Sequence, residues 1–200
     1  HDSHWMVRVN STAALALLAD PADRDLFKVL AISRIPAVRA NALLGLARSG
    51  ISGAASILVR SLARDRYPWA RLNALRGLLQ HGFTQARLAH GDQVYKDAPS
   101  LLAAMASHDM DARVRALSAT LTAGGKPAAP ASRPSHGTRW LGLYLQDHQR
   151  LPLRNRPFLM VDGMGLVRVL QADAQGEAWL HGLPAGSCHV EAPSMPLLPM

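Results

Sequence analysis

Hydrophobic residues in the N-terminal half of the chain recur at the spacing of paired amphipathic helices. In residues 23–50, two apolar clusters lie on either side of Pro36: Leu26, Phe27, Leu30 and then Ala42, Leu43, Leu46, Ala47. Proline suits the first turn of a helix, because the N–H that it lacks would be unpaired there anyway. Gly50 follows the second cluster, as expected of a left-handed C-terminal cap. The pattern predicts two helices, the second beginning at Pro36.

The same pattern returns after a shift of 32 residues. Residues 23–50 and 55–82 are identical at twelve of 28 positions, whereas unrelated sequences would share about two or three. The identities include the two helix-starting prolines and the two closing glycines, at Pro36 and Pro68 and at Gly50 and Gly82. Residues 23–82 are therefore expected to hold two copies of one helical hairpin.

A third, weaker copy lies at 98–124, after an insert at 83–97. Aligning Arg113 with Arg71 also brings Ala116, Leu117, Leu121 and Gly124 onto their counterparts, Ala74, Leu75, Leu79 and Gly82. Near the start of the chain, Asn10-Ser11 could cap a further helix over Thr12–Ala19. We expect three and a half copies in all.

Residues 36–46 read P-x-V-R-x-x-A-L-x-x-L, and this segment resembles the HEAT repeat, including its lyase-type variants. Val38-Arg39 and Ala42-Leu43 carry the resemblance, which covers about residues 11–124. It implies a helical solenoid of the armadillo-like kind over domain 1–124, with copies near 23–50, 55–82 and 98–124. HEAT proteins are mostly scaffolds, so the resemblance is specific for architecture and nearly silent about activity.

The helical period ends in residues 125–137, which are rich in Gly, Pro, Ala and Ser and are typical of a linker. Beyond them, turn signals at 162–165 and 173–176 separate short apolar segments. Strands are expected at 139–145, 157–161, 166–170, 177–180 and 188–191. About five short strands suit a small β-sandwich over residues 138–195.

Residues 173–192, DAQGEAWLHGLPAGSCHVEA, are similar to the end of a carboxypeptidase-regulatory-like or transthyretin-like module. The matching positions are Asp173, Gly176, Ala178, Leu180, Leu183-Pro184, Gly186 and Val190, and Cys188 stands where the module usually has a tyrosine. The resemblance implies a non-catalytic β-sandwich, usually extracytoplasmic. The fold class expected for the chain is therefore α+β, an all-α solenoid followed by a small all-β domain.

Arginine dominates the charge of this chain of 200 residues, which has 22 Lys+Arg against 14 Asp+Glu and a net charge of +8. This charge either favours an acidic partner or reflects composition alone. Arg39, Arg71 and Arg113 fall at equivalent positions of the copies, where they form either an anion-binding stripe or braces to adjacent repeats. The sequence leaves both pairs of alternatives open.

The candidate binding residues are Arg64, Arg66, Trp69 and Arg76. Aromatic rings interleaved with arginine can stack on nucleic-acid bases, although a tryptophan at a helix start also suits the packing between repeats. These residues make nucleic acid the second choice of partner. The first choice is a protein, and the basic charge of the chain would suit an acidic one.

The sequence contains no Gly-rich phosphate loop, HExxH motif or nucleophile elbow. His1 and His4 could grip copper if His1 is a mature N-terminus, or they are ordinary polar residues. A start at His1 and the β-module resemblance favour a processed, extracytoplasmic protein, periplasmic or secreted, and the alternative is a cytoplasmic one. No apolar run is as long as a membrane span, and the lone Cys188 allows no intrachain disulfide.

The sequence as a whole predicts a non-catalytic scaffold that binds a protein partner through its helical surface, as one subunit of a larger assembly. No catalytic residue, metal ligand or cofactor is expected. The alternative is a nucleic-acid binder that uses an arginine-rich face.

Overall fold

The computed structural model describes residues 4–50, 54–80, 98–124, 140–181, 183 and 187–191. It is an α+β protein, with helices in its N-terminal part and two small antiparallel sheets in its C-terminal part, which confirms the expected class. The chain divides into two compact units, His1–Pro130 and Ala131–Met200. The predicted linker at 125–137 and the insert at 83–97 lie outside the described residues.

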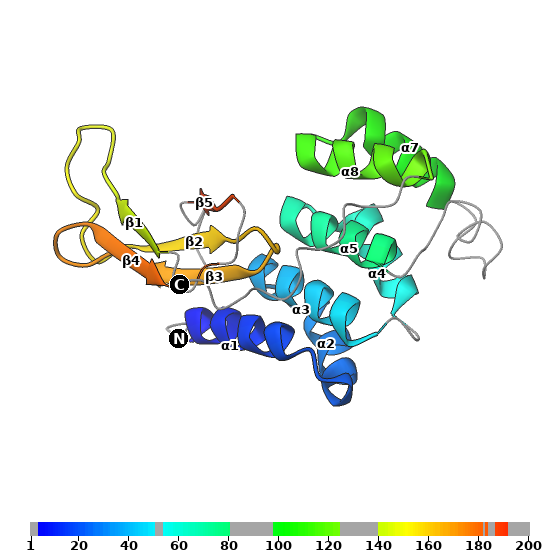
Figure 1. Ribbon diagram of the computed structural model, residues 1–200, viewed down its shortest axis with the longest axis horizontal. Helices are drawn as coiled ribbons and strands as arrows, with labels where there is room; N and C mark the ends of the chain where they lie inside the picture. The colour runs from blue at the N-terminus through cyan, green and yellow to red at the C-terminus, as the bar shows by residue number, and fades with distance from the viewer. Residues whose placement is uncertain are drawn as a thin grey trace. The chain divides into compact units, whose positions relative to one another are not determined.

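The helical unit is built from hairpins that follow one another along the chain (Figure 1). Its elements in the described ranges are α1 (Trp5–Leu18), a short 3-10 turn (Pro21–Asp23), α2 (Arg24–Leu30), α3 (Pro36–Ser49), α4 (Ala55–Arg64), α5 (Pro68–Gln80), α7 (Ala98–His108) and α8 (Ala112–Thr122). Helix α2 packs on α3, α4 on α5 and α7 on α8, while α1, α3, α5 and α8 pack in succession. The second helices of the hairpins thus form a continuous layer.

Prolines begin two of these helices, and leucines fill their buried faces. Pro36 and Pro68 are the first residues of α3 and α5, as the sequence predicts. The paired residues Leu43 and Leu75 are fully buried, which is expected of equivalent positions in stacked hairpins. Burying a leucine side chain contributes about 1.5–3 kcal/mol, so these positions stabilise the layer strongly.

Glycines let neighbouring helices approach closely. A Cβ atom added to Gly45 would lie 2.4 Å from the Phe27 ring, and one added to Gly77 would lie 2.8 Å from the Ala47 Cβ. The repeated glycine thus marks a contact that no larger residue fits. Phe27 is fully buried against Gly45, whereas Leu26 is 43% exposed. The first predicted apolar cluster therefore does not form one buried face, and the expectation that both residues are core is wrong for Leu26.

Two expected helix ends differ from the structure. Helix α1 begins at Trp5, not at residue 12, because Val9, Ala13 and Ala16 form its buried face; Asn10-Ser11 therefore lies inside the helix. Gly50 has φ 104° and ψ 147°, outside the left-handed helical region. The Nη2 atom of Arg24 donates to the carbonyl oxygen of Ser49 at 2.9 Å, and satisfies this end of α3 instead.

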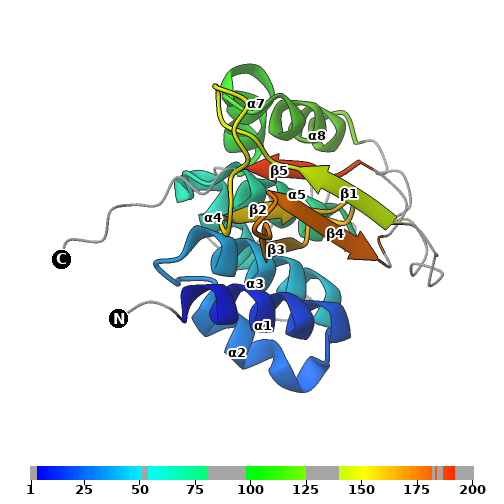
Figure 2. The same cartoon turned by 90° about the vertical axis from the view of Figure 1, so that its left-hand side faces the viewer.

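The β unit has two antiparallel sheets, one with the order β1–β4 and one with the order β3–β2–β5 (Figure 2). The strands are β1 (Trp140–Tyr144), β2 (Pro157–Val161), β3 (Val167–Gln171), β4 (Glu177–His181) and β5 (His189–Glu191), each close to its expected bounds. Asp162 closes the β2–β3 hairpin by accepting from the Met164 and Leu166 N–H groups at 2.9 and 3.1 Å. Both sheets contribute to one core of Phe158, Met160, Ala178, Leu180 and Leu183.

Candidate functional site

A groove opens in the helical unit where the second and third hairpins face each other. We call it the inter-repeat groove; its volume is about 830 Å³. The residues that line it are Leu62, Ala63, Arg64, Asp65, Arg66, Pro68, Arg71, Leu101, Ala104, Met105, His108, Asp109, Met110 and Asp111. They come from α4, α7, the start of α5 and the two turns that lead into α5 and α8.

The two turns have the same structure, because in each an aspartate side chain accepts a hydrogen bond from a backbone N–H group two residues later. Asp65 accepts from the Tyr67 N–H at 2.9 Å, and Asp109 accepts from the Asp111 N–H at 2.8 Å. Such local bonds hold the chain in a turn before the next helix begins. In the first hairpin, Ser33 occupies this place and accepts from the Ile35 N–H at 3.2 Å.

Arg39, in the first turn of α3, joins its own hairpin to the next one. Its Nε and Nη2 atoms donate to the two carboxylate oxygens of Asp65, both at 2.7 Å. Its Nη1 atom donates to the carbonyl oxygen of Ser33 at 2.8 Å. The fork geometry of guanidinium and carboxylate makes this pair directional, and the hydrogen bonds to Asp65 raise the pKa of Arg39 above its usual value.

Arg71 repeats this arrangement one hairpin later. Its Nε and Nη2 atoms donate to Asp109 at 2.8 and 2.7 Å, and its Nη1 atom donates to the carbonyl oxygen of Asp65 at 2.8 Å. We call the pairs Arg39–Asp65 and Arg71–Asp109 the Arg–Asp ladder. Both arginines therefore brace adjacent hairpins, which supports bracing over an anion-binding stripe at these two positions.

The third position of the ladder belongs to Arg115, not to Arg113 as the sequence alignment suggested. Arg39, Arg71 and Arg115 are each the fourth residue of their helix. The Nη1 atom of Arg115 donates to the carbonyl oxygens of Asp109 at 2.6 Å and Met110 at 3.3 Å. The alignment failed by two residues because it matched Ala116 and Leu117 to buried positions, whereas Ala116 is exposed.

Arg113 instead serves the start of α8 and covers Trp69. Its Nη2 atom lies 2.6 Å from Asp111, whose side chain also accepts from the Arg113 and Val114 N–H groups as the helix cap. The side-chain bonds to Arg113 lower the pKa of Asp111 to about 2. The guanidinium carbon of Arg113 lies 3.8 Å from the centre of the Trp69 ring, a cation–π contact.

The four predicted binding residues are separated by the fold. Arg64 and Arg66 are exposed and line the inter-repeat groove. Trp69 is only 4% exposed and lies beneath Arg113, so its ring is part of the packing and not a surface for base stacking. Arg76 is half-buried outside the groove lining and donates to the Asn73 Oδ1 atom at 3.4 Å.

The groove also contains residues that sequence reasoning missed. Leu101, Met105, His108 and Met110 line it from the third hairpin. Met110 is 97% exposed, and it stands between two aspartates in a turn. A large apolar residue between two aspartates could have identified this turn as part of a binding surface from the sequence, because exposed apolar residues beside a groove favour binding.

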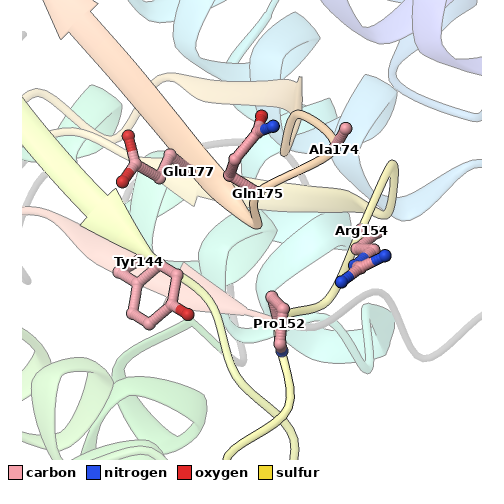
Figure 3. A pocket seen from close by; sticks show the side chains of 6 residues that line it. All are labelled: Tyr144, Pro152, Arg154, Ala174, Gln175 and Glu177. Atoms are coloured by element: carbon pink, nitrogen blue, oxygen red, sulfur yellow. The ribbon is translucent and has the colours of Figure 1, made fainter.

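A second, smaller depression lies in the β unit and has a volume of about 540 Å³. Its lining residues are Tyr144, Pro152, Arg154, Ala174, Gln175 and Glu177, none of them predicted from the sequence (Figure 3). Arg154 and Glu177 lie on opposite sides of it, and Glu177 accepts from the Trp179 Nε1 atom at 3.2 Å. The depression offers polar groups of both signs and no nucleophile paired with a base.

The side chains that could bind a metal ion or react as a thiol are the described histidines, acidic residues and Cys188. Within the described part of the chain, no group of three or more His, Cys, Asp or Glu side chains is placed to hold a metal ion. His4 is described, but His1 is not, so the copper hypothesis falls outside these residues. Burial raises the pKa of the Cys188 thiol, which disfavours its reactive thiolate.

No protein-family model, curated protein sequence or solved structure matches this chain. Among the helices that the structure describes, none is long and apolar enough to cross a membrane.

Proposed function

We propose that the chain is a non-catalytic scaffold that binds a protein partner through its helical unit, as a subunit of a larger assembly. The observation that carries this proposal is the inter-repeat groove, which is open, partly apolar and flanked by the exposed Arg64 and Arg66. A surface that carries methionine and arginine is typical of protein interfaces.

A protein suits the groove better than nucleic acid does. The aspartates among the lining residues, Asp65, Asp109 and Asp111, are each paired with an arginine of this chain. The exposed Arg64 and Arg66 offer two contacts to a phosphate backbone, whose binding depends on several. Trp69 has its ring under Arg113 and offers no stacking platform. Two exposed arginines line the groove, and they can select an acidic segment of a protein partner.

The consecutive hairpins and the Arg–Asp ladder support a HEAT-like helical repeat as the architecture of this scaffold. The two-sheet core of the β unit is compatible with a transthyretin-like module. This resemblance is the reason for proposing an extracytoplasmic location. Fractionation of cells that produce the protein tests the location, and recovery of the protein with cytoplasmic markers would contradict it.

Photo-crosslinking from the groove tests the proposed function. A benzophenone amino acid replaces Met110, on the groove, or Ile32, an exposed apolar residue in the corresponding turn of the first hairpin. Irradiation in cells that naturally produce the protein should give a protein adduct from position 110 and not from position 32. The charge reversals Arg64→Glu and Arg66→Glu should remove the adduct, whereas Arg60→Glu, exposed on α4 outside the groove, should not.

Digestion of the adduct decides between the two classes of partner. An adduct that protease shortens and nuclease leaves intact supports the scaffold function. An adduct that nuclease removes would replace it with the nucleic-acid-binding alternative. Equal labelling from positions 110 and 32 would show that the groove selects no partner.

A further inference from the structure

The β1–β4 sheet exposes two aromatic side chains on its outer face. Its inner face contributes Ala178 and Leu180 to the core, and successive residues of a strand point to opposite faces. Tyr144 pairs with Glu177, two residues before Trp179, so the two aromatic residues are diagonal neighbours on the outer face. Tyr144 is 56% exposed and Trp179 is 58% exposed. Exposed apolar side chains that lie together mark binding surfaces, whereas single ones need no explanation.

The Trp179 ring is held flat against the sheet. A Cβ atom added to Gly142, its partner on β1, would lie 2.7 Å from the ring carbon Cζ3 and 3.0 and 3.1 Å from the adjacent carbons Cη2 and Cε3. These distances place the added atom above the ring plane and not beyond its edge, so one face of the ring lies on Gly142. The Nε1–H group of Trp179 donates to the Oε2 atom of Glu177 at 3.2 Å. The ring is therefore a fixed surface on which a ligand can stack.

The depression of the β unit adjoins this ring through Glu177, which contacts Trp179 and also lines the depression (Figure 3). In the described part of the chain, the side chains of Tyr144, Arg154 and Gln175 make no hydrogen bond or ion pair. They offer a hydroxyl, a guanidinium and an amide to a ligand. The volume of about 540 Å³ lies within the range of small-molecule sites, about 300–1,000 Å³.

Charges of both signs around the depression favour a neutral ligand rich in hydroxyl groups. Glu177 opposes a phosphate backbone, and the unit Ala131–Met200 carries six arginines against five acidic residues, so the basic charge of the chain belongs to the helical unit. Arg154 opposes an organic cation in the same way. A hydroxyl group both donates and accepts hydrogen bonds, so such a ligand can use the carboxylate, the guanidinium and the amide together.

A ligand that stacks on Trp179 also needs an apolar face. In β-linked glucose and N-acetylglucosamine rings, the polar groups point to the rim and C–H groups cover both faces, which suits the electron-rich face of an indole. A proline-rich peptide can stack as well, but proline has no N–H to donate. It would leave the Glu177 carboxylate and the Gln175 carbonyl without a donor, so the combination of ring and polar groups favours a saccharide.

We propose that this surface, formed by Tyr144, Trp179 and the adjoining depression, binds a saccharide chain of β-1,4-linked pyranose rings. The rings stack on the two aromatic side chains, and their hydroxyls bond to Glu177, Arg154 and Gln175. We call this surface the aromatic face. The inference is independent of the proposed protein-binding function, because it concerns the β unit alone.

NMR titration of the full-length, isotope-labelled protein with cellohexaose and with N-acetylchitohexaose tests the inference. The signal followed is the Nε1–H of Trp179, identified by its absence in Trp179→Phe. We expect a saturable shift of this signal with at least one of the two saccharides. A polyproline peptide and a single-stranded oligothymidylate, titrated in the same way, should leave it unchanged.

Two variants separate ligand binding from a merely structural role of the aromatic pair. Arg154→Ala should weaken saccharide binding about tenfold or more, because a charged hydrogen-bond donor is lost. The matched control is Arg156→Ala, since Arg156 is exposed two residues later and does not line the depression; it should bind as the unmodified protein does. Gly142→Ala retains the Trp179 ring but forces it away from the sheet, and should also weaken binding.

Three outcomes would overturn the inference. The first is no shift of the Trp179 Nε1–H signal with either saccharide, and the second is equal binding by Arg154→Ala and Arg156→Ala. The third is a shift caused by the peptide or the oligonucleotide and by neither saccharide, which would assign the aromatic face to that other class of ligand. Each of these results leaves the crosslink from position 110 unaffected, because that experiment probes the helical unit.

Discussion

Arg71 and Arg64 lie seven residues apart and carry the same charge, but their surroundings give them different roles. Arg71 donates to both Asp109 oxygens and to the Asp65 carbonyl, and both partners of the ion pair are nearly buried. Arg64 is exposed at the rim of the groove. The Arg71 guanidinium holds one hairpin against the next, whereas the Arg64 guanidinium is accessible to a partner.

Replacing Arg71 by lysine tests the geometry of the ladder without removing its charge. A lysine ammonium cannot reproduce the fork that meets both Asp109 oxygens and the Asp65 carbonyl. We expect Arg71→Lys to lower the free energy of unfolding by about 1–3 kcal/mol. The exposed control Arg64→Lys should change it by less than about 0.5 kcal/mol. Urea denaturation measures both, and equal effects would mean that charge alone matters at position 71.

Asp111 should make the helical unit sensitive to acid. Its bonds to Arg113 lower its pKa from 3.8 to about 2, so the folded state holds the ionised form more strongly than the unfolded state does. The stabilisation is complete above about pH 4 and is lost as the pH falls toward 2. Because the pair is partly exposed, about 1 kcal/mol is expected.

The variant Asp111→Asn separates this charge effect from the helix cap, since asparagine caps about as well as aspartate. Unfolding free energies of the two proteins should converge by about 1 kcal/mol between about pH 4 and pH 2. Parallel pH curves would show that Arg113 does not stabilise the ionised carboxylate.

Individual side chains were harder to place from the sequence than helices were. The periodic leucines identified Leu43 and Leu75 as core, but nothing in the sequence shows that Arg113 would cover Trp69. That contact depends on how α8 crosses α5, a tertiary arrangement that no local pattern encodes. The alignment selects Arg113 over Arg115 because it follows Ala116 and Leu117. The spacing from the aspartate of the turn, six residues from Asp65 to Arg71 and six from Asp109, leads to Arg115.

At the scale of elements, glycine and phenylalanine fit together where α2 crosses α3. A Cβ atom on Gly45 would lie 2.4 Å from the Phe27 ring, far inside van der Waals contact. Gly45→Ala should therefore destabilise the protein by about 1–3 kcal/mol, although alanine is the better helix former by about 1 kcal/mol.

A smaller residue at position 27 supplies the matched test. Phe27→Leu removes the ring edge that Gly45 faces, so the double variant should recover part of the loss caused by Gly45→Ala. Thermal unfolding of the two single variants and the double variant gives the coupling energy. Strictly additive effects would mean that the alanine is accommodated elsewhere.

Elements whose ends are marked by proline or by turn residues could be predicted from the sequence, and those without such residues could not. Pro36 and Pro68 mark the starts of α3 and α5, and Asp162–Gly165 marks the β2–β3 hairpin. Helix α1 begins well before its expected cap, and the sequence gives no sign of this because its true start lacks a capping side chain. The inter-repeat groove could be foreseen only through Arg64 and Arg66, since its other wall comes from α7, distant in sequence.

At the scale of the whole molecule, each unit has a core of its own. Leu43 and Leu75 lie among the stacked helices, whereas Phe158 and Met160 of β2 pack with Leu180 of β4. The helical unit buries apolar residues between consecutive hairpins, and the β unit buries them between two sheets. Separate cores of this kind allow domains to unfold as separate cooperative units.

A reciprocal pair of core variants tests whether the two units unfold separately. Leu75→Ala and Met160→Ala each truncate a fully buried side chain and should each cost about 2–5 kcal/mol within their own unit. Calorimetry of the full chain should resolve two transitions. Leu75→Ala should move only the one accompanied by loss of the helical circular dichroism signal, and Met160→Ala should move only the other. If either variant shifts both transitions equally, the two cores form one cooperative unit, and partner binding at the helical surface would then also stabilise the β unit.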